Sequence, residues 1–219
     1  MPARTPASKR TRGQGRAPDL PRLLAGALCL DFANTIEAPI SSEPEDFLDD
    51  YTGLVRWSWH ARAIDGGELE RLKALADATP DGGGKVFAQA IRLRRAVDQI
   101  FRAIAAGRVP GDDDLQTLAQ QHRQGVMAAS LVGDGLRFNW SFRGADDLRL
   151  PLWLVSASAV ELLTEGDLAR VKQCPGADDC GWLFYDTSRN GTRRWCSMEG
   201  CGSRMKMRRH YARHRQRAR

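Results

Sequence analysis

The sequence lacks an apolar run long enough to cross a membrane. Its longest stretch without a charged residue is Leu150–Val160, eleven residues, whereas a spanning helix needs roughly 20. The N-terminal residues include basic side chains and prolines but no apolar core of the kind found in signal peptides. We therefore expect neither a membrane protein nor a secreted one, and predict a cytoplasmic location.

The sequence also lacks the patterns of nucleophilic, paired-carboxylate or phosphate-loop chemistry. The glycine run Gly82–Gly84 is without the Lys-Ser/Thr pair of a phosphate-binding loop. Only five cysteines occur, and Cys29, alone between two leucines, is typical of a small buried hydrophobic residue. So few cysteines without a secretion signal do not predict a disulfide framework. We predict that the protein is not an enzyme.

Charge is distributed unevenly, although the 219 residues have a net charge of only +6. Residues 1–20 carry +4, and residues 172–219 carry +8 from twelve Lys/Arg and four acids. The middle, residues 21–171, carries −6 from 16 Lys/Arg and 22 acids. Basic segments attract polyanions, so the two ends are the candidate contact region.

Apolar periodicity predicts a mainly α fold for the acidic middle. The clearest pattern runs from Val86 to Ile104, where apolar residues recur at spacings of four and three and so line one helical face. The glycines of Asp81–Gly84 predict a break before this helix, and Asp112–Asp114 predict the N-cap and first-turn acids of the next one. Helices are expected over 47–62, 68–78, 86–107, 115–122 and 151–165.

The period changes to two between Leu136 and Phe142, where apolar and polar residues alternate. This alternation predicts a half-buried strand. The turn residues Gly133–Gly135 make residues 127–132 its expected hairpin partner. The helical domain is therefore predicted to contain one small β-hairpin.

Four cysteines near the C-terminus have the spacing C-x5-C-x15-C-x4-C: Cys174, Cys180, Cys196 and Cys201. Two close pairs separated by a loop can place four sulfurs around one tetrahedral ion, which predicts one structural Zn²⁺. A redox switch is the alternative, but the spacings are not the C-x-x-C of thiol oxidoreductases. Four thiolates also leave no open position for a catalytic water.

The segments around these cysteines predict a small zinc-stabilised module. Residues 182–185 and 192–195 are expected to be the two strands of a hairpin, because the residues between them favour turns. Residues 203–213 contain no proline or glycine and favour a helix. Knuckle, hairpin and helix in this order form a treble-clef-like zinc finger.

The C-terminal residues resemble the bacterial CGNR zinc finger. The likeness lies in Arg170–Cys174 (RVKQC), Cys180–Asn190 (CGWLFYDTSRN), Arg193–Met198 (RRWCSM) and Cys201–Lys206 (CGSRMK). In that family the finger follows an ABATE domain, inferred to belong to a stress-induced transcription regulator, and Leu28–Thr35 (LCLDFANT) matches its opening motif. The resemblance covers about residues 23–213 and implies a DNA-binding regulator.

One position departs from the family motif. Ser203 stands where the name CGNR has Asn. Both side chains can cap a helix N-terminus through an oxygen, so we expect the fold to be kept. If the Asn of the family reads a nucleic-acid group, the specificity of this chain differs.

The finger presents a dense basic surface. From Arg204 to Arg219 there are eight Lys/Arg and no acid, as expected of a segment that neutralises phosphates. DNA is favoured over RNA because a helical Arg can read guanine in the major groove, although Tyr185 could stack on an unpaired base. The predicted nucleic-acid contacts are Arg189, Arg193, Arg194, Arg204, Lys206, Arg208, Arg209 and Arg213.

The remaining candidates leave several partners open. Asp31, Asn34, Trp57 and His60 could line a ligand pocket in the helical domain, and an enzyme built there is a less favoured alternative. A ribosome-associated protein, a protein-interaction module and a homodimer also stay open. The expected division is a disordered basic arm (1–21), an ABATE-like helical domain (22–168), the finger (169–214) and a basic tail (215–219).

Overall fold

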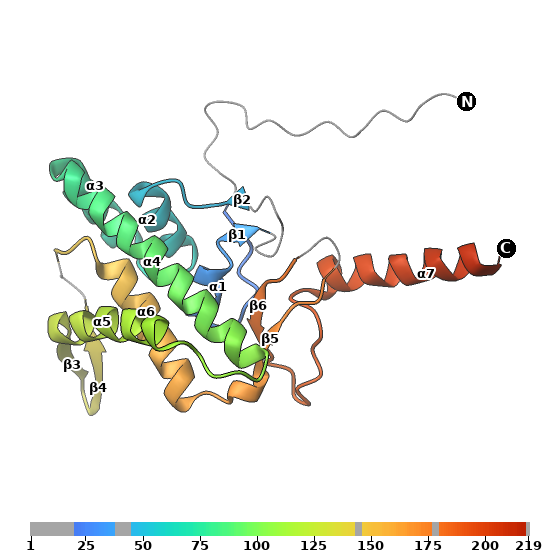
Figure 1. The fold of residues 1–219 in the computed structure, drawn as a ribbon. Helices are drawn as coiled ribbons and strands as arrows, with labels where there is room; N and C mark the ends of the chain where they lie inside the picture. The colour runs from blue at the N-terminus through green and yellow to red at the C-terminus, as the bar shows by residue number, and fades with distance from the viewer. Residues whose placement is uncertain (1–19, 38–44, 143–145, 177–179, 218–219) are drawn as a thin grey trace, which may run out of the picture.

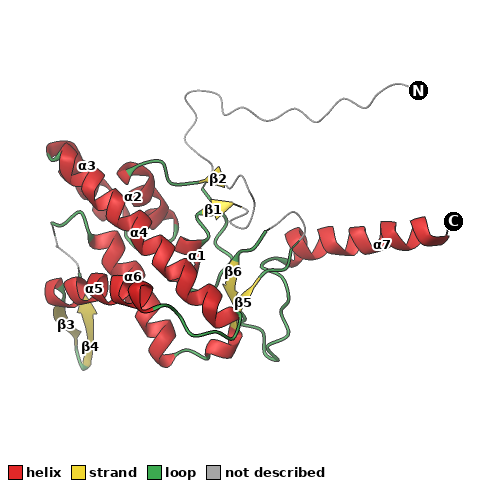
Figure 2. Ribbon diagram, viewed as in Figure 1, coloured by secondary structure: helices red, strands yellow, loops and turns green. Residues whose placement is uncertain are grey.

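The computed structural model describes residues 20–37, 45–142, 146–176 and 180–217. These residues form a mainly helical body with three short antiparallel hairpins and one helix that projects from it (Figures 1 and 2). The mainly α fold class is therefore confirmed. The helices of the body are α1 (Leu28–Ala33), α2 (Tyr51–His60), α3 (Gly66–Ala78), α4 (Pro80–Ala105), α5 (Asp112–Ala128) and α6 (Leu150–Glu165).

Helix α4 runs through the middle of the body (Figure 1). Its apolar stripe is buried as the periodicity predicts, with Leu93, Val97 and Ile100 fully inaccessible to solvent. Helices α1, α5 and α6 pack around it, together with the hairpin that leads into the cysteine region. Burial of this stripe therefore stabilises the fold.

The predicted break before α4 is wrong. The helix begins at Pro80, whose fixed φ suits the first helical position, and continues through the three glycines. A Cβ on Gly82 would lie 3.1 Å from the Cδ1 atom of Leu148. The glycines here permit close packing of neighbouring residues rather than a turn.

Helix α5 also begins and ends outside its predicted range. Gly111 is its N-cap, and Asp112–Asp114 occupy the first turn without capping it. The helix continues to Ala128, so residue 127 is helical and the following strand is shorter than expected.

The predicted hairpin forms, but it is not half-buried. Strand β3 (Ser130–Asp134) pairs antiparallel with β4 (Arg137–Ser141). Phe138 and Trp140 are 67% and 65% exposed, because no other part of the described chain covers the outer part of this hairpin. The alternation of apolar and polar residues predicts the strand, but it does not show whether another part of the protein covers its apolar face.

Two further hairpins form, and the second of them contains the first part of the cysteine region. Strand β1 (Ile36–Glu37) pairs with β2 (Glu45–Asp46), and β5 (Val171–Gln173) pairs with β6 (Leu183–Tyr185). The β5–β6 hairpin contacts α1 and α4, and its Val171 and Leu183 belong to the core of the helical body.

The chain ends in α7 (Ser203–Arg217), which extends away from the body as an isolated rod (Figure 1). The predicted basic tail therefore begins as part of this helix. Residues 1–19 of the predicted basic arm lie outside the described residues, whereas Leu20 packs on the core. Among the described residues, no helix is both long and apolar enough to span a membrane.

Candidate metal centre and nucleic-acid interface

The four predicted zinc ligands come together in one cluster. Cys174 follows β5, Cys180 precedes β6, and Cys196 and Cys201 lie before and within a short helical turn, η3 (Met198–Gly202). All four Sγ atoms lie within 4.8 Å of one another. Those of Cys180 and Cys201 each lie 3.6 Å from that of Cys196. Zn–S bonds of about 2.3 Å in a tetrahedron separate the sulfurs by about 3.8 Å, so the cluster fits one zinc ion.

The surroundings of the sulfurs also fit a metal–thiolate centre. The backbone N–H of Cys196 donates to the Sγ of Cys174 at 3.3 Å, and the guanidinium of Arg204 lies 3.9 Å from the Sγ of Cys201. A Cβ on Gly176 would lie 2.8 Å from that same sulfur, so only glycine fits beside the cluster. Hydrogen bonds from neighbouring thiols, Cys180 first, lower the pKa of Cys174, and the hydrogen bond shared with Cys174 raises the pKa of Cys180. A bound cation would allow all four sulfurs to be thiolates at the same time, because it compensates their negative charges.

The hairpin of the finger differs from the predicted one. The strands that pair are β5 and β6, which flank the first cysteine pair, and the amide of Cys174 donates to the carbonyl of Trp182 at 2.8 Å. Residues 192–195 form no strand. The first cysteine pair therefore lies at the tip of the hairpin, and an irregular loop positions the second pair, Cys196 and Cys201.

Comparison with known proteins agrees with this architecture. Residues 170–214 match the CGNR zinc finger, and residues 26–166 match ABATE, described as a putative stress-induced transcription regulator. The chain belongs to the ABATE family. Both matched families are of a regulator or zinc-finger type rather than enzymes. No curated protein matches the chain.

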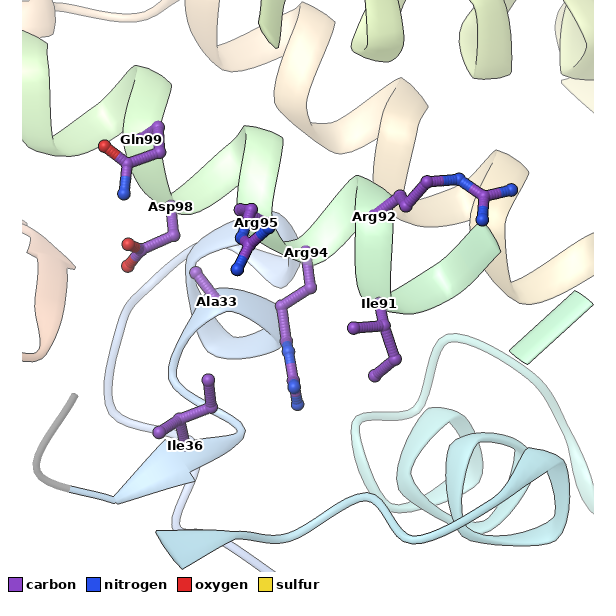
Figure 3. A pocket seen from close by; sticks show the side chains of 8 residues that line it. All are labelled: Ala33, Ile36, Ile91, Arg92, Arg94, Arg95, Asp98 and Gln99. Atoms are coloured by element: carbon purple, nitrogen blue, oxygen red, sulfur yellow. The ribbon is translucent and has the colours of Figure 1, made fainter. Parts of the chain in front are cut away.

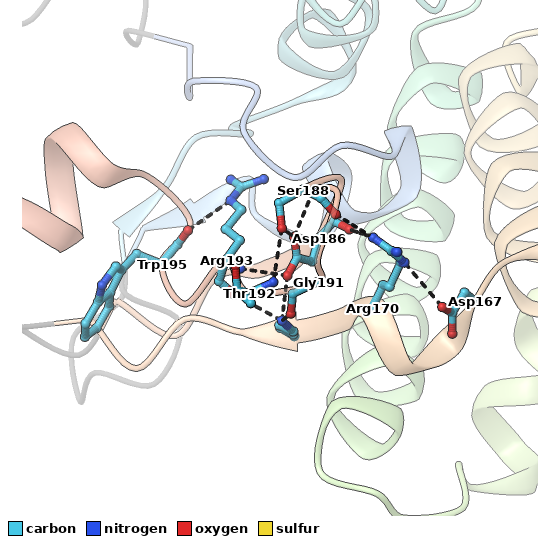
Figure 4. A network of polar contacts seen from close by, with 9 residues as sticks. Asp167, Arg170, Asp186, Ser188, Gly191, Thr192, Arg193 and Trp195 are labelled. Atoms are coloured by element: carbon cyan, nitrogen blue, oxygen red, sulfur yellow. Dashed lines mark hydrogen bonds and ion pairs between the residues drawn. The ribbon is translucent and has the colours of Figure 1, made fainter.

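The irregular loop of the CGNR finger is held by one buried carboxylate, that of Asp186, which is fully inaccessible to solvent (Figure 4). It accepts hydrogen bonds from the ammonium of Lys172 at 2.6 Å, the hydroxyl of Ser188 at 2.6 Å and the amide of Arg193 at 2.9 Å. Burial opposes its ionisation, but these donors outweigh burial and hold the pKa of Asp186 below its usual range. Asp186 is not among the residues predicted from the sequence, where its one signal is that it is the single acid between Cys180 and Cys196.

Two basic residues of the finger motif, Arg170 and Lys172, complete the same network. Arg170 donates to the carbonyls of Asp186 and Ser188 at 2.9 and 2.8 Å. Lys172 also donates to the carbonyl of Gly191 at 2.7 Å. These side chains stabilise the finger from inside and are not part of its contact surface.

Arg193 is predicted to contact nucleic acid, but the structure turns it inward. Its guanidinium donates to the carbonyls of Leu24 at 2.8 Å, Trp195 at 3.0 Å and Cys196, and lies 4.6 Å from the ring centre of Phe184. The side chain thus joins the start of the ABATE domain to the last turn before the metal centre. By contrast, Arg189 and Arg194 are exposed.

Helix α7 carries the exposed basic surface of the finger. Successive residues of a helix turn by about 100°, which places Lys206, Arg209 and Arg213 on one side, hereafter the α7 stripe. All three are exposed, as are Arg204 and Arg208 on the opposite side. The other predicted nucleic-acid residues of α7 are therefore accessible.

Most of the apolar side chains of α7 do not pack on the finger. Met207 and Tyr211 are 55% and 61% exposed. Met205 instead packs against the cysteine cluster. The hydroxyl of Ser203 donates to the carbonyl of Met198 at 3.1 Å, so it joins α7 to the preceding turn rather than capping the helix as predicted.

The residues of the predicted ligand pocket have structural partners in the ABATE domain. Asp31 accepts hydrogen bonds from the amides of Leu24 and Ala25, both at 2.9 Å, and burial raises its pKa. The His60 ring lies 3.0 Å from the carbonyl of Pro21. Trp57 is buried, with its ring centre 5.1 Å from that of Phe32. A ligand pocket at these residues stays a prediction, and their contacts do not support it.

Asn34, the fourth residue of the predicted pocket, joins the ABATE domain to the finger. Its side chain donates to the carbonyl of Leu183 at 2.8 Å and accepts from the amide of the same residue at 2.9 Å. The indole N–H of Trp182 also donates to the carbonyl of Ile36 at 2.9 Å. The opening ABATE motif therefore pairs with strand β6 of the CGNR finger.

Proposed function

We propose that this ABATE protein is a DNA-binding transcription regulator whose CGNR finger contacts DNA through α7 and whose helical domain senses a ligand or a partner. The observation that carries the proposal is an exposed basic helix fixed to a closed four-cysteine centre. The zinc is structural in this proposal, since four thiolates complete its shell.

The charge of α7 suits a polyanion. Its fifteen residues contain no acid, and at 1.5 Å per residue the helix is about 22 Å long. Duplex DNA carries one phosphate charge per roughly 1.7 Å of its axis, so the α7 stripe meets several phosphates when the helix lies in a groove. Arginines in the major groove can also read guanine.

The direction of α7 is fixed at its N-terminal end. Met205 packs on the cysteine cluster, the hydroxyl of Ser203 bonds to the turn before it, and Arg204 lies against the sulfur of Cys201. A basic segment attached in this way binds with less loss of conformational entropy than a free tail. This attachment favours a nucleic-acid reader over a solubilising tail.

The finger is also joined to the domain that would sense a signal. Strand β6 lies against α1, and Asn34 holds Leu183 by two hydrogen bonds. A rearrangement of α1 would therefore move the finger with it. Such a contact is the physical link that a ligand-controlled regulator needs.

The test is a binding titration of the zinc-loaded full chain against random duplex DNA and structured RNA at two salt concentrations. Replacing Lys206, Arg209 and Arg213 with Ala should weaken binding. It should also lower the slope of log K against log salt by about 2.7, because each lost phosphate contact removes about 0.9. The charge-matched control replaces Arg92, Arg95 and Arg108, which are exposed on the acidic body, and should change the slope little.

Each other outcome has a clear meaning. Tighter binding to RNA than to DNA would favour the RNA-binding or ribosome-associated alternative. Equal weakening by both triple variants would show that total charge, not α7, governs binding. Absence of salt-dependent binding to either polymer would refute the proposal and leave a protein-interaction module.

A further inference from the structure

The ABATE domain contains a groove that lies apart from the predicted pocket residues. Its volume is about 880 Å³, within the range of about 300–1,000 Å³ typical of small-molecule sites. It lies between the C-terminal end of α2, the α2–α3 turn, the β3–β4 hairpin and the start of α6. The residues that line it include Trp59, Arg62, Ile64, Arg137, Trp140 and Leu150.

The floor of the groove is apolar and its walls are aromatic. Ile64 and Leu150 are buried in the floor. Trp140 of β4 and Phe142, which directly follows the strand, both line the groove, and the ring of Phe142 lies 6.0 Å from that of Trp153 in the core. Trp140 therefore faces the body across the groove, where it stays 65% exposed, as Trp59 stays 50% exposed.

Two guanidiniums line the same groove without a carboxylate partner. The acids nearby, Asp65 and Glu68, are engaged in a capping box, in which each side chain accepts the other residue's amide at 2.9 Å. Within the described part of the chain, neither Arg62 nor Arg137 forms an ion pair. The groove thus combines apolar surface with two guanidiniums outside any ion pair and two carboxylates held by backbone amides, so its formal charge is balanced.

Arg62 occupies an unusual backbone conformation at this position. Its φ is +58°, the only positive value among the described residues other than glycine. Glycine or asparagine is the common choice at such a position, which here ends α2: the amide of Ala63 donates to the carbonyl of Ser58 at 2.9 Å. The structure thus holds an arginine at the groove where backbone preference favours glycine.

A second, smaller cavity of about 310 Å³ beside α4 also contains arginines (Figure 3). Its buried cation, Arg94, is already paired with both carboxylate oxygens of Asp46, at 2.7 and 2.5 Å. Asp98, which also lines it, holds Arg102 at 2.8 Å. Much of the charge in this cavity is neutralised within the protein.

We propose that the larger groove binds a small aromatic carboxylate. Its carboxylate would bond to Arg62 and Arg137, since guanidinium and carboxylate match in geometry, and its ring would lie between Trp59 and Trp140. The proposal names a ligand class for the sensing role in the proposed function. Its biological meaning rests on that function, whereas the binding itself does not.

The experiment titrates the zinc-loaded full chain with 2-naphthoate and, as a neutral probe of the same shape, 2-naphthylmethanol. Binding is followed by calorimetry and tryptophan fluorescence. Naphthoate should bind at least tenfold more tightly than the alcohol. Arg62→Gly and Arg137→Gln should each weaken naphthoate binding about tenfold, as loss of a charge-assisted hydrogen bond predicts, and should leave the alcohol unchanged.

Two features keep the result interpretable. Glycine accepts the positive φ of residue 62, so Arg62→Gly should keep or raise the unfolding temperature, and weaker binding cannot then be due to unfolding. Arg108→Gln, an exposed arginine outside the groove, is the matched control and should bind as the unchanged protein does.

Three outcomes would overturn the proposal. They are equal affinity for naphthoate and the alcohol, unchanged naphthoate binding in both arginine variants, and a dimer in light scattering that Phe138→Ser dissociates. The last would show that a second copy covers the hairpin and fills the groove. No nucleic acid enters this test, so its failure is distinct from failure of DNA binding.

Discussion

The CGNR finger contains two sets of basic residues with opposite orientations. Arg170, Lys172 and Arg193 point inward, to backbone carbonyls and to the carboxylate of Asp186. The α7 stripe points to solvent. A count of the basic residues in a motif therefore overstates its contact surface.

The difference between the two sets has a simple electrostatic cause. A buried carboxylate and several carbonyl dipoles compensate the inward cations, so these contribute to stability and are screened little by salt. The outward cations lie on a helix without acids, so their field extends into solvent and falls with salt. Substitutions in each set should therefore affect different properties, stability for the inward set and nucleic-acid binding for the outward set.

Loss of the metal should have the largest effect, because both sets depend on the same centre. Cys196→Ser should reduce the zinc content from one per chain to none, unfold the finger and remove nucleic-acid binding, since structural zinc supplies about 10 kcal/mol or more. Metal analysis and limited proteolysis measure this. Cys29→Ser is the control, because that thiol lies in the core away from the cluster, and should retain one zinc.

Removal of the buried charge should have the next largest effect. Asp186→Asn should lower the free energy of unfolding by about 3 kcal/mol, because Lys172 loses its partner in a buried network. The pKa of Asp186 lies below its usual value of about 3.9, so its stabilisation is complete above that pH and is lost as the pH falls through the lower folded value. The difference in free energy of unfolding between the unchanged protein and Asp186→Asn, measured by urea unfolding, should therefore narrow below about pH 4.

The control for the buried charge is an exposed acid of the same finger. The side chain of Glu199 is 86% exposed and lies 3.7 Å from that of Arg22, so Glu199→Gln should change stability by less than about 1 kcal/mol. A loss as large as that of Asp186→Asn would contradict the proposed difference between inward and outward groups.

The smallest effect compares two adjacent arginines. Arg193→Ala should lower the free energy of unfolding by about 2 kcal/mol, because buried carbonyls lose a charged donor. Arg194→Ala should leave stability unchanged and weaken nucleic-acid binding slightly. Equal effects on stability would show that the inward orientation of Arg193 is unimportant.

The metal centre and the helical architecture could be predicted from the sequence because both follow local patterns. Spacing alone brings Cys174 and Cys201 into one cluster, and the three-four periodicity of α4 gives its buried face. The start of α4 could not be predicted, because Pro80 and the packing of Leu148 against Gly82 override the low helix propensity of glycine.

Features that depend on distant contacts could not be predicted. Residues 192–195 have the composition of a strand, but Asp186 takes the amide of Arg193 and no strand forms. The alternation of β4 shows which residues share a face, yet the exposure of Trp140 depends on what lies opposite. The roles of Asn34 and Arg193 likewise arise only when the two ends of the chain meet.

The double hydrogen bond between Asn34 and Leu183 joins residues 149 positions apart. The two family matches end and begin at residues 166 and 170, yet this bond and the burial of Val171 and Leu183 cross that boundary. A fragment that stops there would expose apolar core and leave the Asn34 amide unpaired, so it should aggregate. The two segments are separate in sequence comparison but share one buried core, so we expect that neither could be exchanged between proteins without its partner.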